Sequence, residues 1–147
     1  MEFIYSDGGR SKYFKGEADD CVTRAIANAT GKDYKEVYDA INELSKSERT
    51  GKRKKSRSSA RNGVYRRTYE KYLSSIGWCF KPLMLIGSGC KIHLNETDLE
   101  TAGISKGVYI LSLSGHLTVI KDGVVYDTFN DDRDGTRCIY GYYYKAT

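Results

Sequence analysis

The sequence predicts an α+β fold in which N-terminal helices pack on a C-terminal antiparallel sheet, and two observations predict it. Before residue 77, apolar residues recur three and four positions apart, whereas after residue 107 they fill short runs separated by turn residues. Such segregation of helices and strands is typical of the α+β class. The chain has 147 residues, of which 39% are hydrophobic, which is enough for one core. We therefore expect a single domain over residues 1–147, with a basic loop inserted at about residues 46–63.

Three helices are expected in the first half of the chain, at residues 20–29, 33–44 and 65–76. Each has apolar residues along one face, as a helix packed on a core requires. Gly31 and Gly77 follow the first and third helices and are typical stop signals. Asp33 and Glu36 have the spacing of a capping box, which predicts the start of the second helix.

Runs of strand-forming residues dominate the second half, at residues 78–85, 108–113, 116–121, 124–130 and 138–144. Pro82 predicts that the first of these strands lies at an edge of the sheet, because proline cannot donate a ladder hydrogen bond. Asp122 and Gly123 form a strong signal for a two-residue hairpin turn. A brief helical turn is expected to start at Asn95 or Thr97.

The positive charge is concentrated in one segment. The net charge is +5, yet ten basic residues and a single acid, Glu48, lie between Lys46 and Arg67, so the rest of the chain is mildly acidic. The segment is either a solvated loop or a contact for nucleic-acid phosphate or an acidic protein. It lacks an aromatic residue before Tyr65, so base stacking by the loop is not indicated. The candidate contact residues are Lys52, Arg53, Lys54, Lys55 and Arg57.

The four cysteines, Cys21, Cys79, Cys90 and Cys138, lack the spacing of a disulfide scaffold. We therefore expect free thiols and a cytoplasmic protein. The sequence shows neither a signal-peptide pattern nor an apolar run of membrane-spanning length, so no membrane is expected. His93 with Cys90 and Cys79 offers only one close pair, whereas a structural zinc site needs four ligands. No metal or cofactor is expected.

Three residues on different elements form a candidate constellation for nucleophilic catalysis. Cys21 stands at the expected start of the first helix, where unpaired amides and the helix dipole favour a thiolate. His116 opens one expected strand, and Asp127 lies on the next. The alternative for Cys21 is ordinary packing on an alanine-rich helix face. Asp20, next to it, would cap the helix but disfavour a nearby thiolate.

The hairpin allows a test of whether His116 and Asp127 can meet. With a two-residue turn, Thr118 lies opposite Asp127, and residues two apart on a strand share a face. His116, Thr118 and Asp127 then lie on the same face of the sheet. A three-residue turn would shift the register of the two strands by one residue, so that other residues share the face of His116. Tyr126 and Asn130 would then lie beside His116, so Asn130 is the alternative partner.

These segments resemble the papain-like cysteine peptidase superfamily in its compact bacterial and phage forms. The matching pieces are Asp20-Cys21 at a helix start, residues 107–111, residues 115–120 and residues 125–127. Their order is similar to that in bacteriocin-processing and NlpC-type peptidases. The resemblance implies a papain-like fold with Cys21 as nucleophile, His116 as general base and acid, and Asp127 as the residue that orients His116.

Two positions depart from the family pattern. Lys15 stands where the bacteriocin-processing enzymes carry an oxyanion-hole glutamine, and Val22 follows the cysteine in place of glycine or serine. The Cys21 amide would then act with a second oxyanion donor that the sequence does not identify, and Tyr13 is one candidate.

Three functions follow as hypotheses. The first is a cysteine hydrolase, that is, a peptidase, isopeptidase or amidase, which acts on a peptide or protein substrate. The second is a non-catalytic, phage-encoded binder or inhibitor of a host factor that acts through the basic loop in the host cytoplasm. The third is an acyltransferase that uses the same triad.

Overall fold

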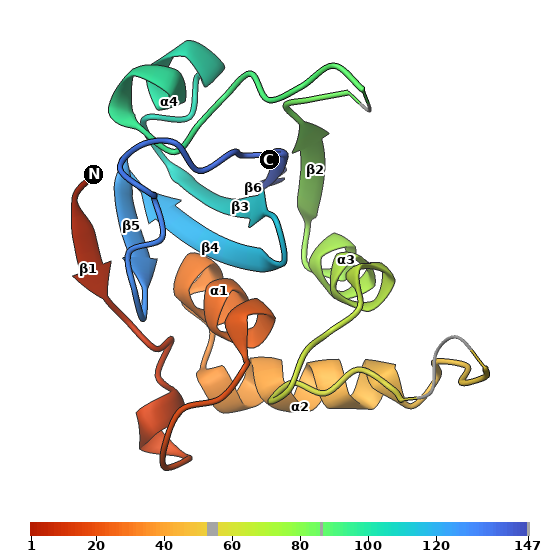
Figure 1. The fold of residues 1–147 in the computed structure, drawn as a ribbon. Coiled ribbons are helices and arrows are strands. Elements are labelled where there is room, and N and C mark those ends of the chain that lie inside the picture. Colours follow the sequence, from red (N-terminus) through yellow and green to blue (C-terminus); the bar gives the residue numbers. More distant parts are fainter. Residues whose placement is uncertain (53–55, 86, 147) are drawn as a thin grey trace.

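The computed structural model describes residues 1–52, 56–85 and 87–146. Over these residues the protein is an α+β structure, with helices on both faces of a six-stranded mixed sheet (Figure 1). The chain forms, in order, β1 (Phe3–Tyr5), a 3₁₀ helix (Arg10–Lys12), α1 (Cys21–Thr30), α2 (Tyr34–Ser45), α3 (Arg66–Ser75), β2 (Trp78–Pro82), α4 (Glu96–Ala102), β3 (Val108–Leu113), β4 (His116–Lys121), β5 (Val124–Asp127) and β6 (Gly141–Lys145).

The strand order is β1-β5-β4-β3-β6-β2, which places β2 at an edge as its proline predicts. The expectation of a purely antiparallel, C-terminal sheet is wrong, because β1 joins the opposite edge and runs parallel to β5, with Phe3 opposite Val125. A strand of three residues is too short to show a periodic pattern. Three predicted strands also shorten, since β2 ends at Pro82, β5 ends at Asp127 and β6 starts only at Gly141.

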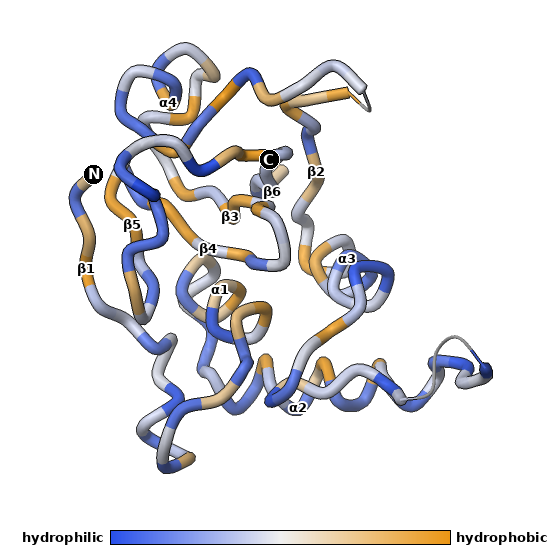
Figure 2. Tube along the Cα trace, in the orientation of Figure 1, coloured by the Kyte–Doolittle hydropathy of each residue, from blue (hydrophilic) through white to orange (hydrophobic). Residues whose placement is uncertain are grey.

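Each face of the sheet carries its own hydrophobic cluster. On one face α1, α2 and α3 pack against residues such as Ile110 and Val119. On the other face, α4 and the neighbouring chain segments cover Leu111 and Ile120. Figure 2 shows the hydrophobic residues along β3, β4 and β5, between these two layers. The site described below lies at the rim of the first layer, where α1 begins beside β4.

Two predicted helix caps are wrong. Asp20 precedes α1, but its carboxylate does not bond to the first-turn amides. Asp33 precedes α2 and likewise makes no side-chain cap; it accepts a hydrogen bond from the Tyr13 hydroxyl at 2.5 Å. Both carboxylates have tertiary partners that compete with the local amides. Asn95 does cap α4, by accepting from the Asp98 amide at 2.8 Å.

Two cysteines expected to be free are joined. Cys90 and Cys138 form a disulfide with Cα atoms 6.0 Å apart and a sequence separation of 48. A β-bridge between His93 and Cys138 brings the two segments together. Such a long-range approach leaves no signature in cysteine spacing, which is why the expectation failed. Cys21 and Cys79 are free thiols.

The basic segment is only partly a surface loop. Lys52 and Arg57 are exposed, while the candidate contacts Arg53, Lys54 and Lys55 lie outside the described residues. The following residues are anchored, because Ala60 is fully buried and its carbonyl accepts from the Thr23 hydroxyl of α1 at 2.8 Å. The far end of the insertion is therefore fixed against α1. Among the helices of the described ranges, none is long and apolar enough to span a membrane.

Candidate active site

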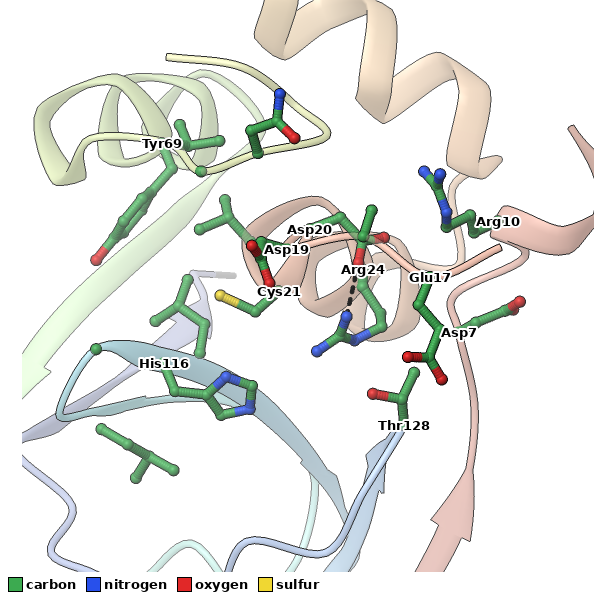
Figure 3. A pocket seen from close by; sticks show the side chains of 18 of the residues that line it. Asp7, Arg10, Glu17, Asp19, Asp20, Cys21, Arg24, Tyr69, His116 and Thr128 are labelled. Carbon is green, nitrogen blue, oxygen red and sulfur yellow. Dashed lines mark hydrogen bonds and ion pairs between the residues drawn. The ribbon is translucent and has the colours of Figure 1, made fainter. Parts of the chain in front are cut away.

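The structure brings Cys21, His116 and Asp127 together. Cys21 is the first residue of α1, His116 the first of β4 and Asp127 the last of β5. Figure 3 shows the Cys21 sulfur beside the His116 ring, and the ring favours the thiolate form of Cys21. His116 Nε2 lies 2.7 Å from Asp127 Oδ2. Because Nε2 is engaged by the carboxylate, Nδ1 is the ring nitrogen left for the thiol.

The two-residue hairpin turn accounts for the pairing of His116 with Asp127. Asp122 and Gly123 both have positive φ angles, 49° and 80°, as a type I′ turn requires. The Thr118 hydroxyl donates to Asp127 Oδ2 at 2.7 Å, which confirms that these side chains share a face. The alternative partner Asn130 lies beyond the end of β5.

The ionisation of the thiol and the ring is coupled. Burial raises the pKa of the Cys21 thiol, but hydrogen bonds from the His116 ring and the Leu117 amide outweigh it, so the pKa lies below its ordinary value. Burial lowers the pKa of His116, but the hydrogen bonds with Asp127 and Cys21 prevail and raise it to about 9. These shifts favour a thiolate–imidazolium pair near neutral pH, the reactive form of a nucleophilic cysteine.

Asp127 is held on both of its oxygens. Its Oδ2 atom contacts His116 and Thr118, while Oδ1 accepts from the Thr128 amide at 2.7 Å and from Arg24 Nε at 3.1 Å. Burial raises the pKa of this carboxyl, but the hydrogen bond with His116 and the nearby charges leave it below its ordinary value. Asp127 is therefore an ionised, fixed acceptor for the His116 ring.

A chain of buried polar residues continues from Asp127 and was missed in the sequence. Arg24 also pairs with Asp20, with Nη1 2.7 Å from Oδ1, as the dashed line in Figure 3 marks. The Tyr34 hydroxyl donates to Asp20 Oδ2 at 2.6 Å, and Arg10 Nη1 donates to the Tyr34 oxygen at 3.3 Å. The one available signal was the four-residue spacing of Asp20 and Arg24 on a helix. This spacing does not identify the ion pair by itself, because an aspartate directly before a helix is equally typical of an N-cap.

A cleft of about 980 Å³ opens over the thiol. One wall is the segment 16–20 that leads into α1, and the facing wall is formed by residues 62–66 and Tyr69. The loops that flank β4 and β5 line the remaining side, where the Phe129 ring packs on His116 with centroids 5.3 Å apart. This volume lies within the range of ligand-binding pockets.

The predicted oxyanion donor Tyr13 is wrong. Its hydroxyl donates to Asp33, and the residue is not among those that line the cleft. The other predicted donor, the Cys21 amide, lies at the N-terminus of α1, where Val22 also lines the cleft. Because the Asp20 carboxylate turns away to Arg24, it does not occupy these helix amides. They are suited to receive a developing negative charge.

Two of the three residues considered for zinc are engaged elsewhere, and the third, Cys79, is a free thiol. Cys90 is in the disulfide, and His93 Nδ1 lies 3.2 Å from Asp98. Within residues 1–52, 56–85 and 87–146, no group of three or more His, Cys, Asp or Glu side chains is arranged to hold a metal ion.

Comparisons with protein-family models, with curated proteins and with solved structures found no match to this chain. The function of the cleft is therefore inferred from the chemistry of its own residues.

Proposed function

We propose that the protein is a cysteine hydrolase of the papain-like type that cleaves an amide, peptide or isopeptide bond. The observation that carries the proposal is that Cys21 and His116 line the same cleft, while His116 Nε2 lies 2.7 Å from the buried Asp127 Oδ2. A thiol at a helix N-terminus, opposed by a histidine on an antiparallel strand, is also the arrangement that the sequence resemblance implies. The papain-like assignment rests on that resemblance and on this geometry.

The reaction would proceed through an acyl-enzyme. The Cys21 thiolate attacks the substrate carbonyl carbon, and the α1 N-terminal amides stabilise the resulting oxyanion. The C–N bond breaks as the His116 imidazolium protonates the departing amine, which leaves a thioester on Cys21. His116 then takes a proton from water, and the hydroxide attacks the thioester. Breaking the C–S bond releases the carboxylic acid and restores the thiolate–imidazolium pair.

An acyltransferase would use the same first half-reaction. An amine in place of water would then attack the thioester, and the product would be a new amide. Only analysis of the products separates this alternative from hydrolysis.

The basic segment supports a second candidate, a binder or inhibitor that acts through its charge. Asn62 and Gly63, within this segment, line the cleft, so a partner held by the charged loop would lie close to the cleft. Reversing the charges at Lys52 and Arg57 tests this role. Partner binding that survives the reversal at low salt would eliminate the loop as the binding element.

The compartment is also part of the proposal. The sequence led to the expectation of a cytoplasmic protein, whereas the Cys90–Cys138 disulfide favours an oxidising compartment. Cys21 is not part of this disulfide and is a free thiol.

The hydrolase proposal is tested by incubating the wild type and Cys21→Ala with a complex peptide mixture and sequencing the new termini by mass spectrometry. We expect new termini, and a transient acyl adduct on Cys21, with the wild type only. Cys79→Ser is the matched control, because it removes the other free thiol, which is exposed on β2. Cleavage that persists in Cys21→Ala would exclude Cys21 as the nucleophile.

A further inference from the structure

Arg24 lies buried between two carboxylates, one of which belongs to the proposed triad. Its side chain is 7% exposed, and its guanidinium contacts Asp20 Oδ1 at 2.7 Å and Asp127 Oδ1 at 3.0 Å. We propose that Arg24 is a positioning residue, which fixes Asp127 toward His116 and is itself held by Asp20. This inference rests on the proposed hydrolase function, because it assigns a role relative to that triad.

The geometry separates the tasks of the two Asp127 oxygens. Oδ1 is fixed by Arg24 and by the Thr128 amide, and Oδ2 is thereby directed to His116 Nε2 and the Thr118 hydroxyl. A carboxylate held on one oxygen cannot rotate without losing those bonds. The orientation of the His116 ring therefore depends on a residue that does not touch it.

Asp20 and its partners hold the other side of Arg24. The Tyr34 hydroxyl, from α2, donates to Asp20 at 2.6 Å, and Arg10, from the 3₁₀ helix, bonds to Tyr34. Asp20, Arg10 and Arg24 are 2%, 5% and 6% exposed, so water contributes little to these contacts. Arg10 and Tyr34 thus support Arg24 indirectly, through Asp20.

The charges of this cluster balance. The anions are Asp20, Asp127 and the Cys21 thiolate, and the cations are Arg10, Arg24 and the His116 imidazolium. Asp7 and Glu17 also line the cleft near Arg24, and both appear beside it in Figure 3. Removing Arg24 leaves two buried carboxylates without the cation between them, a situation that favours protonation of one of them.

The Arg24→Gln variant tests this role through the pH dependence of Cys21 alkylation by iodoacetamide. The positive charge of Arg24 favours the thiolate, and an ionised Asp127 favours the imidazolium that pairs with it. Without Arg24 we expect the apparent thiol pKa to rise by about one unit, so that alkylation below that pKa slows about tenfold. At high pH, where the thiol is ionised in both proteins, the rates should converge.

Arg137→Gln is the matched control. Arg137 is 4% exposed and pairs with Asp131, so its loss should also destabilise the fold, but it contacts no triad side chain. We expect it to lower the thermal midpoint without moving the alkylation profile. If Arg24→Gln does not fold, the double variant Asp20→Asn with Arg24→Gln removes both charges of the buried Asp20–Arg24 pair. It should show the same rise in the apparent pKa of the Cys21 thiol.

The two proposals fail in different ways. An Arg24→Gln or double-variant profile that coincides with the wild type overturns the positioning role and leaves the hydrolase proposal intact. A wild-type Cys21 that alkylates with the pH dependence of an ordinary thiol overturns the hydrolase proposal itself.

Discussion

Asp127 uses its two oxygens for different partners, and this division organises the site. Oδ2 contacts the His116 ring, and Oδ1 is bound to the main chain and to Arg24. Neutralising this residue without changing its shape therefore removes the charge that favours the imidazolium while most of the contacts are preserved.

Asp127→Asn should lower the His116 pKa from about 9 toward its ordinary value of 6.5. The measurement is an NMR titration of the ring protons, which is simple because the sequence holds only two histidines. His93 serves as the internal reference. We also expect substrate turnover to fall by roughly 10²–10⁴-fold, because the imidazole tautomer is no longer fixed. An unchanged His116 titration would show that Asp127 does not set its pKa.

The raised pKa of His116 also predicts how stability depends on pH. Since the folded-state pKa of about 9 exceeds the ordinary value of 6.5, the protonated ring stabilises the fold fully below pH 6.5. This contribution disappears as the pH rises through about 9. The lowered pKa of Cys21 acts in the opposite sense, so the comparison is between Cys21→Ala and Cys21→Ala with His116→Gln. The difference in their free energies of unfolding should shrink as the pH rises, and a constant difference would contradict the linkage.

At the scale of elements, the length of the β4–β5 hairpin turn fixes the register that places His116 and Asp127 on the same face of the sheet. Gly123 has a φ of 80°, which a β-branched residue adopts only with strain. Gly123→Val should therefore lower the free energy of unfolding by about 1–2 kcal/mol. Gly123→Asn is the control, because asparagine tolerates the left-handed region, and it should cost less. Equal losses in urea unfolding would indicate that backbone strain at the turn is not the cause.

The Cys90–Cys138 disulfide ties the segment before α4 to the segment before β6. Closing a loop between cysteines with a sequence separation of 48 should stabilise the fold by about 4 kcal/mol in the chain-entropy view. Cys90→Ser should lose a comparable amount, measured by urea unfolding under non-reducing conditions. Cys79→Ser should be near neutral because that thiol is free and exposed. Alkylation of Cys90 in the unreduced wild type would contradict the pairing.

At the scale of the whole molecule, local patterns predicted the helices, the hairpin and the edge position of β2. Hairpin parity placed His116 and Asp127 on one face, because that argument needs only a turn length and the alternation of a strand. β1 was missed because three residues carry no period. The disulfide and the Arg24 contacts were missed because they depend on which distant segments meet, and a single sequence does not encode this in its spacing.

The central claim is that Cys21 and His116 form a reactive thiolate–imidazolium pair. The most direct measurement is the rate of Cys21 alkylation by iodoacetamide across pH, in the wild type and in His116→Ala, with each adduct located by mass spectrometry. Cys79, the free thiol exposed on β2, provides an internal comparison in the same molecule. We predict that Cys21 reacts at a pH where an ordinary thiol is protonated, and that this reactivity is lost in His116→Ala. Reaction at Cys21 with an ordinary thiol pH dependence in both proteins would contradict the account.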